Sequence, residues 1–155
     1  MGTEIERKFL VPGPFPLPPE GKTIRQGYLN SEPDRTVRVR RIGDAAWLTI
    51  KGLKVGDTAP EFEYPIPTDD ADFMLDRLCE PGCIDKTRYL VPYAGFTWEV
   101  DVFAGANEGL VIAEIELERP GQPFETPAWV GQDVTEDSRY QNSSLSRTPY
   151  SQWER

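Results

Sequence analysis

The stretch Glu4-Ile5-Glu6-Arg7-Lys8-Phe9-Leu10 decides the fold, because charged side chains recur in it at every second residue. Successive side chains of a β-strand point to opposite faces, so Glu4, Glu6 and Lys8 share one face and apolar residues take most of the other. Two like charges on one face are unfavourable unless a cation or a basic side chain lies over them. Taken alone, the strand is typical of a solvated outer face, and the rest of the chain decides its meaning.

The length and charge of the chain narrow the classes of function. A chain of 155 residues predicts one domain over residues 1–155 with a core of its own. Its 17 basic and 26 acidic residues give a net charge of −9, which argues against binding to nucleic acid or to anionic membranes. With no long apolar run and no apolar leader, we expect no membrane span and a cytoplasmic location. Any bound anion must be held by a local basic cluster.

The chain has no histidine, and this excludes several kinds of catalytic site. Ser-His-Asp and Cys-His nucleophiles, histidine metal sites and zinc hydrolysis all require that residue. The two cysteines, Cys79 and Cys83, have no metal-ligand companions, so we expect them to be structural. The remaining chemistry uses carboxylates, Lys, Arg, Tyr and a hard metal ion.

The alternation of the first stretch returns along the chain. A helical period at 68–78 predicts a helix that covers the apolar face of the strands, and a short helix is expected at 138–145. Residues 11–21 are rich in proline and predict a surface loop, and the tail at 149–155 should be ordered only if Tyr150 and Trp153 dock. The expected strands are 4–10, 23–30, 36–42, 46–51, 61–66, 84–91, 96–103 and 111–118.

The charged faces of these strands contain six basic and nine acidic residues. Many short strands joined by turns predict an antiparallel sheet that closes on itself, and periodicity alone leaves two orientations open. The apolar residues could fill a small barrel with the charges outside, or the charges could line a wet tunnel whose apolar exterior is covered. The charged residues are Glu4, Glu6, Lys8, Arg38, Arg40, Lys51, Glu61, Glu63, Lys86, Arg88, Glu99, Asp101, Glu114, Glu116 and Glu118.

The separation of the charges by sign favours the tunnel. Basic residues cluster on the third, fourth and sixth expected strands and acidic residues on the first, fifth, seventh and eighth, with almost no neutral polar residue between them. Surface charges are usually scattered and mixed. Basic groups beside oxygen ligands for a hard cation are the components of a site for phosphoryl transfer.

Several motifs, in order over nearly the whole chain, resemble the CYTH domain, or triphosphate tunnel metalloenzyme, family. The first stretch matches the E-x-E-x-K signature of that family. The resemblance implies a mainly β (α+β) fold, an eight-stranded antiparallel β-barrel tunnel with a charged interior and a few covering helices. The matching segments are 26–29, 37–40, 49–51, 61–63, 86–88, 98–103, 113–117, 134–135 and 139–142.

The resemblance also implies roles for individual residues. Triphosphate oxygens would be bound by Lys8, Arg38, Arg40, Lys51, Lys86 and Arg88. One or two Mg²⁺ or Mn²⁺ ions would be held by Glu4, Glu6, Glu114 and Glu116, with Asp101 and either Glu99 or Glu118 in support. Tyr28 beside Lys51 or Lys8 resembles the catalytic lysine and tyrosine pair of short bacterial inorganic triphosphatases. Glu63, with Glu61, would have one of three roles: orienting the basic residues, binding a second metal or positioning water.

The expected function is therefore metal-dependent hydrolysis of the terminal phosphoanhydride of inorganic triphosphate. Thiamine or nucleoside triphosphatases and class IV-type adenylate cyclases share the tunnel and stay open as alternatives. A polyphosphate- or nucleotide-binding module is a further alternative, but binding alone does not need both carboxylate clusters. The family also makes a homodimer unsurprising. The loop at 11–21 departs from the family, whose members often have a helix there, and leaves the cover of the tunnel entry open.

Overall fold

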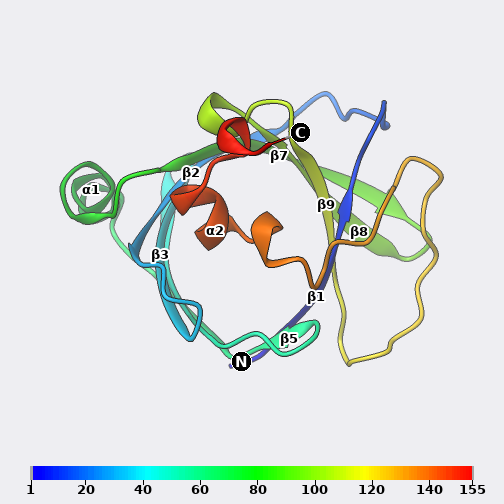
Figure 1. The fold of residues 1–155 in the computed structure, drawn as a ribbon, viewed down its shortest axis with the longest axis horizontal. Coiled ribbons are helices and arrows are strands. Elements are labelled where there is room, and N and C mark those ends of the chain that lie inside the picture. The colour runs from blue at the N-terminus through cyan, green and yellow to red at the C-terminus, as the bar shows by residue number, and fades with distance from the viewer. Residues whose placement is uncertain (1, 155) are drawn as a thin grey trace.

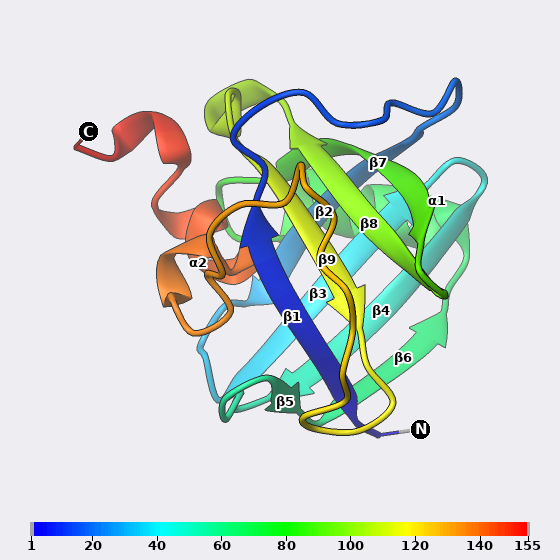
Figure 2. The ribbon, with the colours of Figure 1, turned by 90° about the vertical axis from the view of Figure 1, so that its right-hand side faces the viewer.

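A computed structural model describes residues 2–154, which form one sheet of nine antiparallel strands bent round into a barrel (Figures 1 and 2). Along the sheet the strand order is β5-β1-β9-β8-β7-β2-β3-β4-β6. The predicted antiparallel barrel is confirmed, with one additional strand of two residues, β5, and a last strand that ends at Glu116. The strands are β1 (Glu4–Leu10), β2 (Lys22–Asn30), β3 (Arg35–Ile42), β4 (Ala45–Gly52), β5 (Thr58–Ala59), β6 (Glu61–Pro65), β7 (Ile84–Tyr93), β8 (Phe96–Phe103) and β9 (Val111–Glu116).

The short strand β5 completes the ring. It pairs with β1, where Glu4 lies opposite Ala59, and Pro60 alone separates it from β6 at the other end of the strand order. The backbone N–H of Glu61 donates to the carbonyl of Gly2 over 3.1 Å, which continues the contact between the start of the chain and β6. The two ends of the sheet are thus joined through the chain itself.

Aromatic packing on the outside of the barrel fixes which face of the sheet points inward. Trp98 of β8 is fully buried, and its ring lies 5.5 Å from Phe9, 5.9 Å from Phe124 and 6.1 Å from Trp129, measured between centroids. Phe124 and Trp129 belong to the irregular segment after β9, which therefore covers the outer face of β1, β8 and β9. The apolar residues are outside under this cover, and the charged residues of the same strands point inward.

A second cover lies over β3 and β4. The helix α1 (Thr68–Phe73) continues into a π-helical turn, η1 (Met74–Leu78), and together they span the predicted helix. Ala71 and Leu75 of this segment are buried against Val39 and Ala46.

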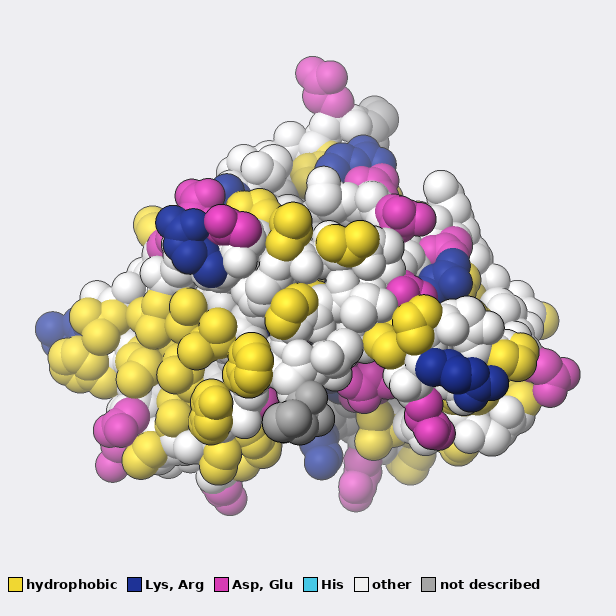
Figure 3. All heavy atoms as spheres, turned by 90° about the horizontal axis from the view of Figure 1, so that it is seen from below, with side chains coloured by type: hydrophobic (Ala, Val, Ile, Leu, Met, Phe, Trp, Pro, Cys, Tyr) yellow, Lys and Arg dark blue, Asp and Glu magenta, His cyan; other side chains and the backbone are white. Residues whose placement is uncertain are grey.

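The cover over the strands is incomplete on the side of β6. Ile50, Phe62 and Tyr64 are exposed on the outer face of β4 and β6, where Ile50 pairs with Phe62. Figure 3 shows hydrophobic side chains gathered on one side of the face seen from below.

The C-terminal segment lies over one end of the barrel (Figures 1 and 2). It contains η3 (Ser138–Tyr140), α2 (Asn142–Arg147) and η4 (Tyr150–Gln152), and η2 (Gly105–Asn107) forms the turn between β8 and β9. The ring of Trp153 lies 5.1 Å from those of Tyr140 and Tyr150, so the tail docks through its aromatic residues. Within residues 2–154 no helix has the length and apolar character needed to cross a membrane.

Candidate active site

The barrel encloses a cavity of about 550 Å³ to which all nine described strands contribute. Among residues 2–154, six basic and nine acidic side chains line it, an excess of three negative formal charges. The C-terminal segment closes one end with residues between Thr135 and Ser144. The charged lining residues are Lys8, Arg38, Arg40, Lys51, Lys54, Arg88, Glu4, Glu6, Asp57, Glu61, Glu63, Glu99, Glu114, Glu116 and Glu136.

Arg88 is held firmly in the cavity wall. Its Nε donates to Asp101 Oδ1 over 2.7 Å and its Nη2 to Asp101 Oδ2 over 2.9 Å, a bidentate pairing that follows from their opposed positions on β7 and β8. Nη2 also lies 3.3 Å from Glu114 Oε1. Burial opposes the charge of Arg88, but Asp101 and Glu114 outweigh it and raise the pKa of the guanidinium. The orientation of this cation is therefore set before any ligand binds.

Lys86 and Asp101 lie behind the wall and do not line the cavity. Lys86 Nζ is 2.7 Å from Asp101 Oδ2 and 3.2 Å from Asn142 Oδ1, and its side chain has no exposed surface. Burial opposes ionisation of Asp101, but Lys86 and Arg88 outweigh it and hold its pKa below the ordinary value. These contacts are consistent with the supporting role expected for Asp101, and they favour such a role for Lys86 over the direct phosphate contact that the family resemblance implies.

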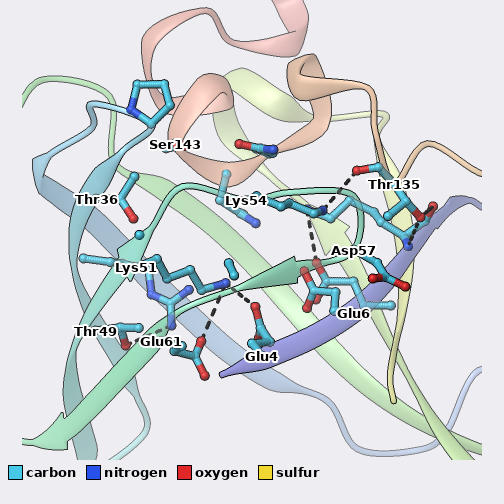
Figure 4. A pocket seen from close by; sticks show the side chains of 18 of the residues that line it. Glu4, Glu6, Thr36, Thr49, Lys51, Lys54, Asp57, Glu61, Thr135 and Ser143 are labelled. Atoms are coloured by element: carbon cyan, nitrogen blue, oxygen red, sulfur yellow. Dashed lines mark hydrogen bonds and ion pairs between the residues drawn. The ribbon is translucent and has the colours of Figure 1, made fainter. Parts of the chain in front are cut away.

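Lys51 and Lys8 are each paired with a carboxylate of the cavity lining. Lys51 Nζ lies 2.5 Å from Glu4 Oε1 and 3.6 Å from Glu61 Oε2 (Figure 4). Burial opposes its charge, but Glu6 and Glu4 outweigh burial and raise its pKa, so the ammonium stays protonated. Lys8 Nζ lies 3.3 Å from Glu114 Oε2 and donates to the carbonyl of Tyr140 over 3.2 Å, which ties β1 to the C-terminal segment.

The two arginines of β3 have different partners. Arg38 Nη2 donates to Thr49 Oγ1 over 3.1 Å and lies 3.4 Å from Glu63 Oε2, which in turn accepts from Thr49 over 2.7 Å. Glu63 thus orients a basic residue, one of the three roles considered for it. Arg40 Nε donates to Gln26 Oε1 over 2.8 Å, and burial, with Arg38 nearby, lowers the pKa of Arg40 to about 10.

Tyr28 is buried and lines the same cavity as Lys51 and Lys8. A β-bulge shifts the register between β2 and β3 directly after it. Among the described residues no hydrogen bond joins its hydroxyl to either lysine, and both ammonium groups are paired with carboxylates. The predicted lysine and tyrosine pair lies in the lining of one cavity, and its catalytic role stays a prediction.

The carboxylates of β1 and β9 form the acidic side of the site. Glu6 lies opposite Glu116 in the pairing of the two strands. Burial, with Glu114 and Glu4 nearby, raises the pKa of Glu6 to about 7, and burial, with Glu4 and Glu6, raises the pKa of Glu116. These groups repel one another, which a cation placed among them would relieve.

The donor set fits a hard divalent cation, since Glu4, Glu6, Glu114 and Glu116 supply only oxygen atoms. Within residues 2–154, no three acidic side chains converge closely enough to hold an ion by themselves. Mg²⁺ typically uses one or two carboxylates and completes its shell with water and substrate phosphate, so such a cage is not required. The assignment of these four residues as metal ligands stays a prediction.

Several lining residues were not among the predicted site residues. Thr49 lies on the same strand face as Lys51, so the alternation of β4 already indicated its direction. Gln26 shares a face with Tyr28 but is fully buried behind the lining, where it is the partner of Arg40. Lys54 lies in a loop, where no periodicity indicates direction.

Comparison with known proteins gives consistent matches over nearly the whole chain. The model of the CYTH domain matches residues 2–150. An inorganic triphosphatase of Acetivibrio thermocellus is 48% identical over 151 residues, which cover 97% of each chain. An inorganic triphosphatase of Nitrosomonas europaea is 38% identical over 93% of this chain and 97% of its own. A solved structure of an inorganic triphosphatase superposes with a TM-score of 0.67 at 36% identity, covering 94% of this chain and 95% of that one.

Proposed function

Because the chain belongs to the CYTH domain family, we propose that it hydrolyses inorganic triphosphate inside its barrel. The observation that carries the proposal is the cavity itself, in which basic side chains of β3, β4 and β7 face carboxylates of β1 and β9. A triphosphate needs cations along its oxygens, and attack on its terminal phosphorus needs charge stabilisation and an oriented water. Relatives that are 48% and 38% identical and carry the name inorganic triphosphatase support this substrate.

The basic wall binds the phosphate oxygens in this proposal. Arg88 keeps its two bonds to Asp101 and presents the rest of its guanidinium to the cavity. Arg40 is bonded to an amide oxygen only, so its charge is available to an anion. Lys51 stays protonated beside Glu4 and acts as a phosphate-binding cation.

The acidic side holds the divalent cation, with Glu4, Glu6, Glu114 and Glu116 as the proposed ligands. The cavity lining of residues 2–154 has more acidic than basic groups, so added positive charge would strengthen the binding of a polyanion. When bound, the ion would neutralise charge that develops on the phosphate oxygens during transfer. Burial, with Glu114 and Glu4 nearby, raises the pKa of Glu6 to about 7, and a cation bound among these carboxylates would favour their ionised form.

The test is phosphate release from tripolyphosphate, measured with ATP and thiamine triphosphate in parallel and with or without Mg²⁺ or Mn²⁺. We expect metal-dependent release from tripolyphosphate that Glu4→Ala and Lys51→Ala both abolish. Lys22→Ala is the matched control, because Lys22 is exposed and lies outside the cavity lining. No release from any of the three substrates would refute hydrolysis and direct the search to cyclic AMP formation, and then to binding without turnover.

Three further assignments belong to the same proposal. Mg²⁺ or Mn²⁺ is the proposed cofactor because hard oxygen donors suit both ions. The cytoplasm is the proposed location, and triphosphate is the proposed small-molecule partner. Assembly as a homodimer stays a prediction, which the molar mass in solution would check.

A further inference from the structure

Lys54 lies in the loop that joins β4 to β5, and it is a cavity-lining cation outside the predicted set. The loop is fixed by two hydrogen bonds between Val55 and Thr58, of 2.8 and 3.1 Å, around the turn at Gly56. The backbone N–H of Glu6 donates to the carbonyl of Asp57 over 3.0 Å, which attaches the loop to β1. The backbone that carries Lys54 is therefore held in place beside the acidic side of the site.

The side chain of Lys54 spans the opening between this loop and the C-terminal segment (Figure 4). Its Nζ donates to the carbonyl of Thr135 over 3.0 Å. Thr135 is itself fixed, because its Oγ1 accepts from the backbone N–H of Lys8 over 2.9 Å and its N–H donates to Asp133 over 2.9 Å. Lys54 thus lies at the covered end of the cavity, with one of its three N–H donors used.

The cations of the cavity fall into two groups by their partners. Each of the other lining cations except Arg40 is paired with at least one carboxylate. Within residues 2–154, Lys54 and Arg40 are the lining cations without one, since Arg40 is bonded to Gln26 and Lys54 to a backbone carbonyl. Burial, with Lys8 nearby, lowers the pKa of Lys54. Glu6 and Glu114 offset these effects only in part, so an anion beside this half-buried ammonium would stabilise it.

We propose that Lys54 is a further substrate-binding residue, whose ammonium binds a phosphate oxygen at the end of the tunnel covered by the C-terminal segment. This inference rests on the proposed triphosphatase function. The loop position makes Lys54 a contact to the bound polyanion at the end of the cavity that the C-terminal segment covers. Such a contact is made in the ground state and the transition state alike, so it acts on KM and leaves kcat nearly unchanged.

The experiment compares Lys54→Met and Lys54→Arg with the wild type and with Lys22→Met as the control. The readouts are KM and kcat for tripolyphosphate with Mg²⁺, the affinity for tripolyphosphate in metal-free buffer by calorimetry, and the Tm of each variant. A bond to a charged group predicts a KM about 10-fold higher in Lys54→Met, with kcat within about twofold. Lys54→Arg should recover most of the lost affinity, and Lys22→Met should match the wild type.

Two results would overturn the inference. The first is a KM for Lys54→Met within about threefold of the wild type, with an unchanged Tm. The second is a lower Tm for Lys54→Met with an unchanged KM, which would mean that Lys54 only connects the loop to Thr135. Should Lys54→Met fail to fold, Lys54→Gln against Lys54→Arg gives the same comparison of charge. A wild type that neither binds nor hydrolyses tripolyphosphate would refute the proposed function itself, whereas a normal wild type with an unaffected variant refutes this inference alone.

Discussion

Asp101→Asn removes the buried carboxylate on which two cations of the cavity wall depend. The side chain is about 1% exposed and lies 2.7 Å from both Lys86 Nζ and Arg88 Nε. Asparagine keeps the shape of the side chain but loses the charge. Its amide N–H₂ group would also face at least one of the two cations, where no acceptor remains.

The expected loss of stability is large. Removal of one partner from a buried ion pair costs about 3–5 kcal/mol, because the other charge is left without compensation. For a chain of this length, Tm changes by about 2–4 °C for each kcal/mol, so a fall of roughly 6–20 °C is expected. The double variant Asp101→Asn with Lys86→Met removes one of the stranded charges and should recover at least about 2 kcal/mol.

Urea unfolding and thermal unfolding measure the effect directly. Asp85→Asn is the control, because Asp85 is exposed on the same strand as Lys86 and should change stability by less than about 0.5 kcal/mol. A loss below about 1 kcal/mol for Asp101→Asn, or a double variant less stable than the single one, would refute the reasoning. A stable Asp101→Asn protein that no longer binds a divalent cation would instead make Asp101 a metal ligand.

Two further predictions concern stability away from the site. Burial opposes ionisation of Asp133, but hydrogen bonds from Thr135 outweigh burial and lower the pKa of the carboxyl group. The carboxylate therefore stabilises the fold above about pH 4, and this contribution is lost as the pH falls below that value. In urea unfolding at pH 6, Asp133→Asn should therefore be less stable than the wild type by under about 1 kcal/mol. The difference should shrink as the pH falls below about 4, and a difference that stays constant would contradict this. Gly82→Ala should destabilise the protein by about 2 kcal/mol more than Gly95→Ala in the same assay. Both glycines have positive φ, but only at Gly82 would an added Cβ lie 1.9 Å from the carbonyl oxygen of Ser146. Equal losses of stability in the two variants would contradict this.

The alternation of charged and apolar residues predicted which residues share a face of each strand. It left open whether the charged or the apolar face points into the barrel. The decision came from what covers the apolar side, because Phe124 and Trp129 of an irregular segment pack on Trp98. A segment without periodicity gives no sequence signal of where it docks, so this cover could not be predicted. The helix over β3 was predicted because its apolar residues recur at helical spacing, whereas the π-helical geometry of its second half had no such signal.

In the candidate site, the sequence predicted which way the side chains point but not how deeply they are buried. Most of the charged residues expected to face inward line the cavity, because strand geometry alone fixes the direction of a side chain. Depth depends on the neighbouring strand: Asp101 lies opposite Arg88 and beside Lys86, so the two cations enclose it and keep it from the cavity. Lys54 was missed for another reason, because the loop before β5 has no repeating pattern.

The pairing of β1 has a consequence for how the chain folds. This strand, near the start of the sequence, pairs with β9 and is hydrogen-bonded to Thr135, 127 residues further along the chain. During synthesis its partners emerge many seconds after it, at about 5–20 residues per second. Until then the edge that pairs with β9 lacks its native partner, and contacts of such long sequence separation slow folding. The strand with the E-x-E-x-K signature is made before β9, so this edge stays open to association with other strands until β9 follows.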